Sequence, residues 1–514
     1  MKVVFRVDAS RAIASGHITR CLALAQSLRK RGADCTFVSR EVAGNLLASV
    51  VEAGFEQLVL AGPLELSARE LSHSAGRTPA EEDAQGTIEA LAGERPAWLV
   101  VDHYGIDESW EKMLRPHVGR ILVIDDLANR KHECDVLVDQ NFNLLGSERY
   151  SRLVNEDTLL LCGPRFAMLQ PEFAHQRSAS KRERSTGLQA FISFGGSDRE
   201  NLTGLALEAF QLPAFKEIAL DVAIGQQNPH REILAEVISK RTNARTHYAP
   251  TSLAPLMAAS DFAVGAGGTT TWERFCLDLP SVVVASAENQ IPSCESLEGA
   301  GRINYVGFWT DVTVATLQTA IETVVDALES PDRVSPEPLV DGLGSERIAE
   351  VMIPTPEGTL VVRPATRQDV GSYFSWVNDP QVRSQSLQTE PVSWPEHQVW
   401  FDQHLTDLDS LMLVLEARDL PIGQVRFDCT GDHAILDYSV DMIVRGRGLG
   451  AALLRRGLQR LEMRSPLTVE AEVRNGNRAS AVTLTRSGFE AVRSNAGRGT
   501  TSYFHRLGST VVDQ

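Results

Sequence analysis

A histidine stands where a helix is expected to begin. In IASGHITRCLALA, residues 13–25, His17 follows Gly16 and precedes apolar residues at helical spacing, whereas Ser, Thr, Asp or Asn usually occupies this place. The positive end of the helix dipole disfavours a charged imidazole, so His17 is expected to stay neutral and able to take a proton, as a general base acting on water must. A capping or packed histidine is the alternative that position alone leaves open. Asp8, at the end of the preceding strand-like run, and Arg20, one turn further along the helix, are expected to lie near His17 and to contact the same ligand.

Two glycine-rich turns are candidates for holding a phosphate. FISFGGSD (191–198) and GAGGTTTWE (265–273) each place glycines and hydroxyl side chains directly after a strand-like run. In a parallel sheet such turns aim backbone amides at the ligand-binding edge, but neither matches the dinucleotide motif GxGxxG or the P-loop, so a nucleoside diphosphate fits better. Glu273 would accept hydrogen bonds from ribose hydroxyls, or would simply be a first-turn glutamate that the helix dipole favours. The predicted ligand-binding residues of this edge are Gly195, Gly196, Ser197, Gly267, Gly268, Thr269, Glu273, Asn289 and Gln290.

A third glycine-rich turn, RGRGLG at 445–450, lies between the strand-like LDYSV and the helical run AALLRRGLQRL. Glycine lets consecutive backbone amides turn toward an anion, and the start of the helix adds partial positive charge, which together predict a pyrophosphate site. A plain strand-to-helix turn is the alternative. The predicted ligand-binding residues of this turn are Arg445, Gly446, Arg447, Gly448 and Gly450.

The elements that must position these residues fall into three blocks. Over residues 1–170 and 171–353, short β-rich runs such as VVFRV, WLVVD, LQAFISF and SVVVAS alternate with helical periodicity, which predicts parallel strands joined by helical crossovers. A polar stretch at 175–186 interrupts this pattern as a linker or loop would. After PTPEG at 354–358, residues 359–507 contain consecutive strands, which indicates antiparallel pairing. We therefore predict an α/β chain with two Rossmann-like domains facing each other across a cleft, followed by an α+β domain.

Composition bounds what the chain can bind. It has 514 residues and a formal net charge of -17, which repels nucleic acid and anionic membrane surfaces. Its seven cysteines show neither a CxxC pair nor a regular spacing, so no disulfide framework or zinc site is expected. The apolar run at the N-terminus is too short for a signal peptide, and no run of about 18 apolar residues occurs. These features predict a cytoplasmic protein that binds small ligands without a metal and does not insert into a membrane.

The first two blocks resemble a known family. The series RVDASRAIASGHITRCLALA, LVVDHYGID, LVIDDLANRKHECDVLVDQN, LCGPRFAMLQPEF, SFGGSD and GAGGTTTWE, over residues 1–349, is similar to the UDP-sugar hydrolases of the pseudaminic acid pathway. The resemblance implies the GT-B architecture and hydrolysis of UDP-2,4-diacetamido-2,4,6-trideoxy-β-L-altropyranose at its anomeric carbon, with inversion and without a metal. It also implies that His17 is the base that activates water.

The third block resembles the GNAT acyltransferases, because RGRGLG and VEAEVRNGNRASAVTLTRSGF stand in that family's order of motifs. The resemblance implies that acetyl-CoA binds as a co-substrate, with its pyrophosphate at 445–450, its pantetheine arm along the strand of Val440 and a contact from Asn477. WVNDPQVR (376–383) resembles the acceptor-side loop of members that act on amino sugars or protein N-termini. Many members carry a tyrosine acid in the last helix, where this chain has Thr483. The proton-transfer groups therefore stay open among four candidates, Asp437, Asp441, Tyr438 and Tyr503.

Together the two resemblances predict a bifunctional enzyme whose partners are acetyl-CoA and a UDP-linked amino sugar. The third block would acetylate the 4-amino group of a UDP-4-amino-4,6-dideoxy-N-acetyl-altrosamine, and the first two blocks would then remove UDP. Two alternatives remain for the first two blocks. They are a GT-B glycosyltransferase, which would transfer the sugar to an alcohol, and a non-catalytic nucleotide-sugar binding module that presents substrate to the acetyltransferase.

Overall fold

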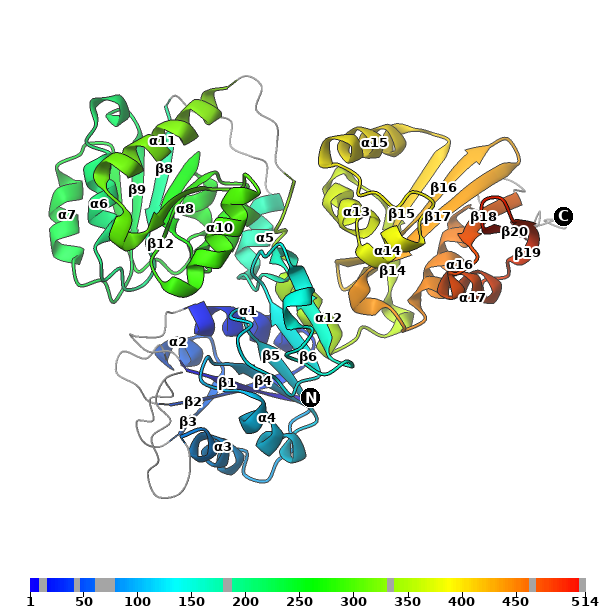
Figure 1. Cartoon of the computed structure of the whole chain (residues 1–514), viewed down its shortest axis with the longest axis horizontal. Coiled ribbons are helices and arrows are strands. Elements are labelled where there is room, and N and C mark those ends of the chain that lie inside the picture. The colour runs from blue at the N-terminus through cyan, green and yellow to red at the C-terminus, as the bar shows by residue number, and fades with distance from the viewer. Residues whose placement is uncertain are drawn as a thin grey trace, which may run out of the picture. The chain divides into compact units, whose positions relative to one another are not determined.

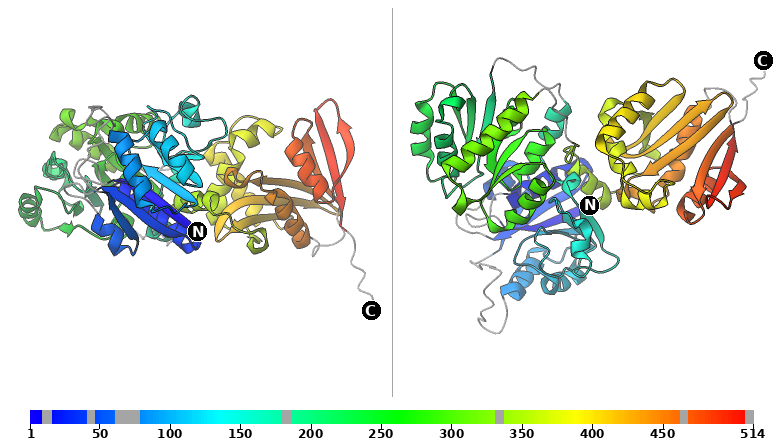
Figure 2. Two further views of the ribbon diagram at one scale, coloured as in Figure 1. Left: turned by 90° about the horizontal axis from the view of Figure 1, so that it is seen from below. Right: turned by 45° about the horizontal axis from the view of Figure 1, so that its top comes forward.

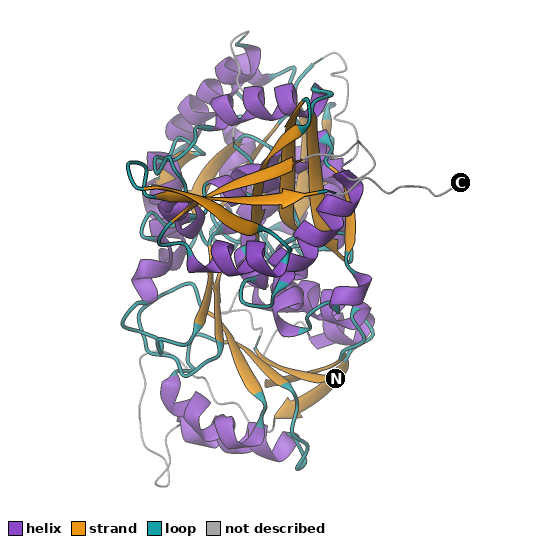
Figure 3. Cartoon of the chain, turned by 90° about the vertical axis from the view of Figure 1, so that its right-hand side faces the viewer, coloured by secondary structure: helices purple, strands orange, loops and turns teal. Residues whose placement is uncertain are grey.

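The computed structural model describes residues 1–8, 16–40, 47–60, 79–178, 187–330, 337–461 and 468–507. The chain divides into two compact units, Met1–Met352 and Ile353–Gln514. Both are drawn in Figure 1, and further views are given in Figures 2 and 3. Most of the predicted polar linker, residues 179–186, lies outside the described residues. In the part of the chain that the structure describes, no helix has the length and apolar character to cross a membrane.

The first half of the first unit is built on a seven-stranded parallel sheet in the order β3-β2-β1-β4-β5-β6-β7. Its central strands, such as β1 and β4, are buried on both faces, as continuous apolar runs such as WLVVD require. The strands are β1 (Lys2–Val7), β2 (Asp34–Arg40), β3 (Glu56–Leu60), β4 (Trp98–Asp102), β5 (Arg120–Ile124), β6 (Val136–Asp139) and β7 (Leu159–Cys162). The α-helices of this half are α1 (Gly16–Lys30), α2 (Leu47–Glu52), α3 (Pro79–Ala90) and α4 (Glu108–Leu114).

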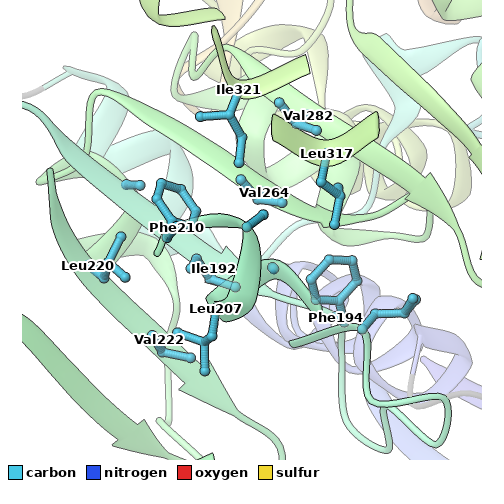
Figure 4. Packing of buried hydrophobic residues seen from close by; sticks show 14 of the residues in the cluster. Ile192, Phe194, Leu207, Phe210, Leu220, Val222, Val264, Val282, Leu317 and Ile321 are labelled. Carbon is cyan, nitrogen blue, oxygen red and sulfur yellow. The ribbon is translucent and has the colours of Figure 1, made fainter. Parts of the chain in front are cut away.

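The second half has a six-stranded parallel sheet in the order β10-β9-β8-β11-β12-β13. Its strands are β8 (Gln189–Ser193), β9 (Ala219–Ile224), β10 (Ala244–Tyr248), β11 (Phe262–Ala266), β12 (Ser281–Ala285) and β13 (Asn304–Phe308). The helices are α5 (Pro171–Ser178), α6 (Leu202–Ala209), α7 (Arg231–Ser239), α8 (Ala254–Ala258), α9 (Thr270–Cys276), α10 (Ile291–Gly299) and α11 (Val314–Glu329). Figure 4 shows the core on one face of this sheet, where Ile192 and Val264 of the strands meet Phe210 and, from α11, Leu317 and Ile321.

The last helix of the first unit, α12 (Gly344–Met352), packs against α1 of the first half. A buried ion pair joins Arg31 Nη1 to Glu350 Oε2 over 2.5 Å, and the Trp98 indole donates to the carbonyl of Met352 over 3.1 Å. By its contacts α12 therefore belongs to the first half, although the prediction from sequence grouped residues 171–353 together. The observed pair of parallel sheets, joined by a returning C-terminal helix, is GT-B-like.

The second unit is an α+β domain with a seven-stranded sheet in the order β14-β15-β16-β17-β18-β20-β19. All neighbours pair antiparallel except β17 and β18, which run parallel. The strands are β14 (Val361–Pro364), β15 (Ser410–Ala417), β16 (Leu420–Thr430), β17 (His433–Val440), β18 (Thr468–Arg474), β19 (Glu490–Asn495) and β20 (Thr500–Arg506). The helices are α13 (Val370–Val377), α14 (Pro380–Gln385), α15 (Trp394–Thr406), α16 (Leu449–Leu461) and α17 (Arg478–Arg486).

Helices cover both faces of this sheet (Figure 1). Tyr373 of α13 and Phe401 of α15 pack with Met412 and Val414 on one face. On the other face α16 approaches so closely that a Cβ on Gly457 would lie 2.9 Å from Val425 Cγ1. Because neighbouring residues of a strand point to opposite faces, β16 and β17 present different side chains to each helical layer.

Candidate active sites

His17 lies in the first turn of α1, directly above the end of β4. Its Nδ1 is 2.5 Å from Oδ1 of Asp102, and both side chains are almost completely buried. The two residues meet because β1 leads into α1 and β4 pairs beside β1, with Val7 opposite Asp102. The sequence prediction named His17 but missed Asp102, although WLVVD carries a carboxylate at the end of a buried strand.

Arg20 holds the carboxylate in place. One turn after His17, its Nε and Nη2 donate to the two oxygens of Asp102 over 2.7 and 2.6 Å, a bidentate pair. Burial alone would raise the pKa of Asp102, but the charge of Arg20 and the hydrogen bond from His17 outweigh it and hold that pKa well below its usual range. Asp102 is therefore ionised and can only accept hydrogen bonds. Nδ1 of His17 must carry the hydrogen of that contact, which leaves Nε2 as the ring nitrogen with a free lone pair.

Tyr104 connects this pair with the second half of the unit. Its ring meets the imidazole of His17 edge-on, with 4.7 Å between ring centroids. The Tyr104 hydroxyl donates to Asp126 Oδ2 and accepts from Asn289 Nδ2, both over 3.1 Å. Arg20 Nη1 also donates to Asp126, over 3.2 Å. The structure thus brings three predicted residues, His17, Arg20 and Asn289, into one contact network through two residues that the prediction missed.

Gly16 marks a second close approach between the halves. A Cβ at this position would lie 3.0 Å from Cγ2 of Thr269, which follows β11. A larger residue at 16 would push the two segments apart, so glycine here permits the approach. The start of α1 and the turn after β11 therefore lie against each other, as the prediction that both belong to one site requires.

The turn after β11 is also packed against the segment after β12. A Cβ on Gly267 would lie 2.4 Å from Cys294 Sγ, and one on Gly268 would lie 3.4 Å from Gln290 Nε2. Gln290 is itself held, since its Oε1 accepts from the backbone of Ser286 over 2.9 Å. The predicted residues Gly267, Gly268, Thr269 and Gln290 therefore form one continuous surface at the carboxyl ends of β11 and β12.

One carboxylate oxygen of Glu273 is buried and accepts no hydrogen bond. Its Oε2 is buried and has no hydrogen-bond partner, and burial raises its pKa to about 7 despite the neighbouring charge of Arg274. Arg274 is occupied elsewhere, since its Nη2 donates to the Ala266 carbonyl over 2.7 Å. Buried acceptors normally have partners, so Glu273 Oε2 is available to a hydroxyl donor.

Gly195, Gly196 and Ser197 follow the carboxyl end of β8, which pairs beside β11. Gly195 has a φ of +87°, and a Cβ on Gly225 would collide with the Gly196 carbonyl, so the turn is fixed in place. The next residue, Asp198, accepts from the backbone of Leu202 over 2.9 Å at the start of α6. These residues lie at the same sheet edge as the β11 turn.

The structure places Asp8 in a different network from His17. Its oxygens accept from Arg6 Nη1 and Nη2 over 2.6 and 2.9 Å and from the backbone of Arg40 over 2.8 Å. His103 Nε2 lies 3.2 Å from the same carboxylate. Ligand binding by Asp8 stays a prediction, and its described contacts are structural.

In the second unit, the 445–450 turn offers backbone and space to a ligand. Gly446 and Gly448 both have a φ of +76°, and a Cβ on either would meet no described atom within 4 Å. Arg445 reaches across to α14, with Nη2 2.9 Å from Asp379 and Nη1 donating to Gln381 over 2.9 Å. The predicted turn for the acetyl-CoA pyrophosphate is thus open and fits that anion. At the end of the turn, a Cβ added to Gly450 would lie 3.1 Å from Thr483 Cγ2.

The other predicted acetyl-CoA contacts lie on both sides of the parallel strand pair. Val440 is the last residue of β17 and pairs with Gly423 on the β16 side. Asn477 caps α17, with its Oδ1 accepting from the Ser480 backbone over 3.0 Å. Arg447 donates to the carbonyl of Thr355 over 3.3 Å. Val440 therefore ends β17, and Asn477 lies in the turn that follows β18, the two parallel strands of the sheet.

Comparisons with known proteins divide the chain in the same way. Residues 359–490 match the family model described as "Acetyltransferase (GNAT) domain". The "UDP-2,4-diacetamido-2,4,6-trideoxy-beta-L-altropyranose hydrolase" of Campylobacter jejuni is 28% identical over 291 residues, which cover 56% of this chain and 93% of that protein. The "Uncharacterized protein MJ1062" of Methanocaldococcus jannaschii is 22% identical over 433 residues, or 81% of each chain. The crystal structure of MurG from Acinetobacter baumannii covers 68% of this chain and 99% of its own, at 12% identity and a TM-score of 0.46.

Proposed function

We propose that this chain, which joins a part homologous to a UDP-sugar hydrolase to a GNAT acetyltransferase domain, carries out two consecutive reactions on one sugar nucleotide. The second unit would acetylate the 4-amino group of UDP-4-amino-4,6-dideoxy-N-acetyl-altrosamine with acetyl-CoA. The first unit would then hydrolyse UDP-2,4-diacetamido-2,4,6-trideoxy-β-L-altropyranose to UDP and the free sugar. The order follows from the chemistry, because the substrate named for the Campylobacter relative already carries both acetamido groups.

The observation that carries the hydrolytic half is the buried His17–Asp102–Arg20 arrangement. In the proposed step, Nε2 of His17 takes a proton from water while the water oxygen bonds to the anomeric carbon and the bond from that carbon to UDP breaks. Ionised Asp102 fixes the imidazole tautomer and stabilises the imidazolium that forms. A single displacement of this kind inverts the configuration at the anomeric carbon.

UDP would occupy the edge formed by the turns after β8 and β11. Backbone amides of the glycine turns would stabilise the charge that develops on the β-phosphate as UDP leaves, so the proposed step uses no metal. Glu273 Oε2, which is buried and unpartnered, would accept a hydrogen bond from a ribose hydroxyl. Asn289 and Thr269 already contact the His17 side of the site and would hold the sugar between the two halves.

Acetyl-CoA would bind with its pyrophosphate on the open 445–450 turn and its arm between β17 and β18. When bound, it supplies an acetyl thioester whose carbonyl carbon an uncharged amine can attack. The open space around Gly446 and Gly448 and the end of the β17–β18 pairing at Ile435 support this placement.

The test of the hydrolytic half is UDP release from the diacetamido sugar nucleotide by the wild type and two variants. We expect His17→Ala and Asp102→Asn each to lower kcat by at least about 100-fold, since each removes or misorients the general base. His117→Ala, which alters an exposed histidine, serves as the matched control. Turnover within threefold of the wild type for His17→Ala would contradict the assignment.

The same assay separates the two alternatives. A glycosyltransferase would release UDP faster with an alcohol acceptor present and would form a glycoside that mass spectrometry detects. A binding module would show UDP-sugar binding by calorimetry with no UDP release. We expect free sugar with and without acceptors, because the imidazole of His17 is placed to deprotonate water.

A further inference from the structure

The edge of β17 that faces β18 is open over its second part. The two strands pair only from His433 to Ile435, opposite residues 468–470. β17 nevertheless continues to Val440, where it still pairs with Gly423 of β16. Beyond Ile435 the described strands show no further pairing between β17 and β18, so the edge at residues 436–440 offers unpaired backbone groups to an extended ligand. The side chains of residues 436–440 lie alternately on the two faces of the sheet, beside this open edge.

Asp437 presents its carboxylate on the face of α13 and α15. It pairs opposite Arg426 of β16, and the Arg426 guanidinium lies 4.9 Å from the ring centre of Trp400 in α15. Gln424 Nε2 donates to Asp437 Oδ2 over 2.8 Å, which orients the carboxylate. Asp437 is otherwise exposed, so an amine reaching the edge from this face would meet a fixed, accessible carboxylate.

Tyr438 occupies the opposite face, toward α16 and α17. A Cβ on Gly450 would lie 3.7 Å from Tyr438 Cε2, which places the ring below the glycine turn. The Tyr438 hydroxyl lies near the side chains of Ser480 and Thr483 on α17, the helix that follows β18. The phenol therefore lies between the glycine turn and α17. Burial raises the pKa of Tyr438, so the group is protonated at neutral pH.

The two other candidates are placed elsewhere. Asp441 is almost fully buried, and it accepts from Trp376 Nε1 over 2.8 Å and from the Ile443 backbone over 3.2 Å. Its carboxylate therefore fixes α13 and the turn after β17. Tyr503 lies on β20, opposite Ala471, and β18 stands between that strand and the open edge.

We propose that the neighbouring residues Asp437 and Tyr438 are the base and the acid of acetyl transfer, one on each face of the open edge. The inference rests on the proposed function and extends it to the proton transfers. The 4-amino nitrogen bonds to the acetyl carbon, the carbon–sulfur bond breaks, and the amine proton passes to Asp437, directly or through one water. The departing sulfur takes the hydroxyl proton of Tyr438, and both residues regain their starting state by exchange with solvent.

The experiment compares Asp437→Asn and Tyr438→Phe with the wild type in the full chain. Acetylation of the UDP-4-amino sugar is followed by CoA release, and the dissociation constant of CoA is measured separately by calorimetry. We expect kcat to fall about 100-fold in each variant, while the KM for acetyl-CoA and the CoA dissociation constant stay within threefold. Asp432→Asn is the control, because Asp432 is an exposed carboxylate in the turn between β16 and β17.

Three results would overturn the inference. Turnover within threefold of the wild type in either variant removes that residue from the chemistry. A loss of CoA affinity as large as the loss of kcat makes Tyr438 a binding residue. Loss of turnover in Tyr503→Phe but not in Tyr438→Phe moves the acid to the other tyrosine. A wild-type chain that acetylates no UDP-4-amino sugar would instead overturn the proposed function, and this inference with it.

Discussion

At the scale of single residues, the arrangement around His17 shows how position and partner act together. His17 lies in the first turn of α1, and its Nδ1 is 2.5 Å from the carboxylate of Asp102, which comes from the end of β4. Arg20 keeps Asp102 ionised and oriented, so three residues from two elements define one proton acceptor.

Glu273 allows a test in which stability and binding change in opposite directions. Burial raises the pKa of Glu273 from its ordinary value of 4.5 to about 7. Between pH 4.5 and pH 7 the folded chain therefore binds more protons than the unfolded chain. The contribution of Glu273 to the stability of the fold consequently falls as pH rises through this range. Glu273→Gln removes the buried charge. At pH 8 we expect the free energy of unfolding of the variant to exceed that of the wild type by about 1 kcal/mol or more, and its unfolding temperature to be higher. Both differences should disappear toward pH 5.

The same substitution should weaken UDP binding at pH 8 by about tenfold or more, because a charged acceptor of a ribose hydroxyl is lost. Thermal unfolding at pH 5 and pH 8 and calorimetric titration with UDP measure the two effects. Unchanged UDP affinity would mean that Glu273 is only a helix-start glutamate, the alternative that its position in the sequence left open.

At the scale of elements, both sheets of the first unit collect functional groups at the carboxyl ends of their strands, as open parallel sheets do. The apolar runs made these strands predictable, and the glycine turns after β8, β11 and β17 stood out by composition. Asp102, Tyr104 and Asp126 were not predicted as site residues. They lie 85 or more positions after His17, and only the strand order β1-β4-β5 brings them to it. The sequence shows that a strand ends in a carboxylate but not which strand lies beside it.

Asp83 of α3 forms buried ion pairs with the first sheet, and its substitution measures how much they contribute to stability. This fully buried carboxylate accepts from Arg6 Nη2 over 2.6 Å, from Arg40 Nε over 2.8 Å and from Trp110 Nε1 over 3.0 Å. Burial would raise the pKa of Asp83, but the guanidinium of Arg6 lowers it below its usual range. Asp83→Ala removes one carboxylate partner from each of two buried guanidinium groups, and we expect a loss of about 3–5 kcal/mol in the free energy of unfolding.

Urea denaturation of the full chain measures this loss, with the exposed Asp157→Ala as the control. A loss under about 1 kcal/mol for Asp83→Ala would show that the cluster rearranges around the missing carboxylate. Asp8 belongs to the same network, because it shares Arg6 with Asp83.

At the scale of the whole molecule, the chain carries two separately built units that the sequence already distinguished by their strand patterns. The hydrolase relative from Campylobacter jejuni matches over 56% of the chain, whereas the relative from Methanocaldococcus jannaschii matches over 81% and so reaches past the first unit. That match therefore includes residues of the second unit as well as of the first. If both units act on one sugar nucleotide in the proposed order, the first unit needs the product of the second, which makes acetyl-CoA a requirement for UDP release.

The most direct measurement is mass spectrometry of the full chain incubated with UDP-4-amino-4,6-dideoxy-N-acetyl-altrosamine, with and without acetyl-CoA. We expect UDP and free diacetamido sugar only when acetyl-CoA is present, and an intact UDP-sugar when it is absent. Release of UDP without acetyl-CoA would contradict the proposed order of reactions. An acetylated sugar that stays attached to UDP would contradict the role of His17 in hydrolysis.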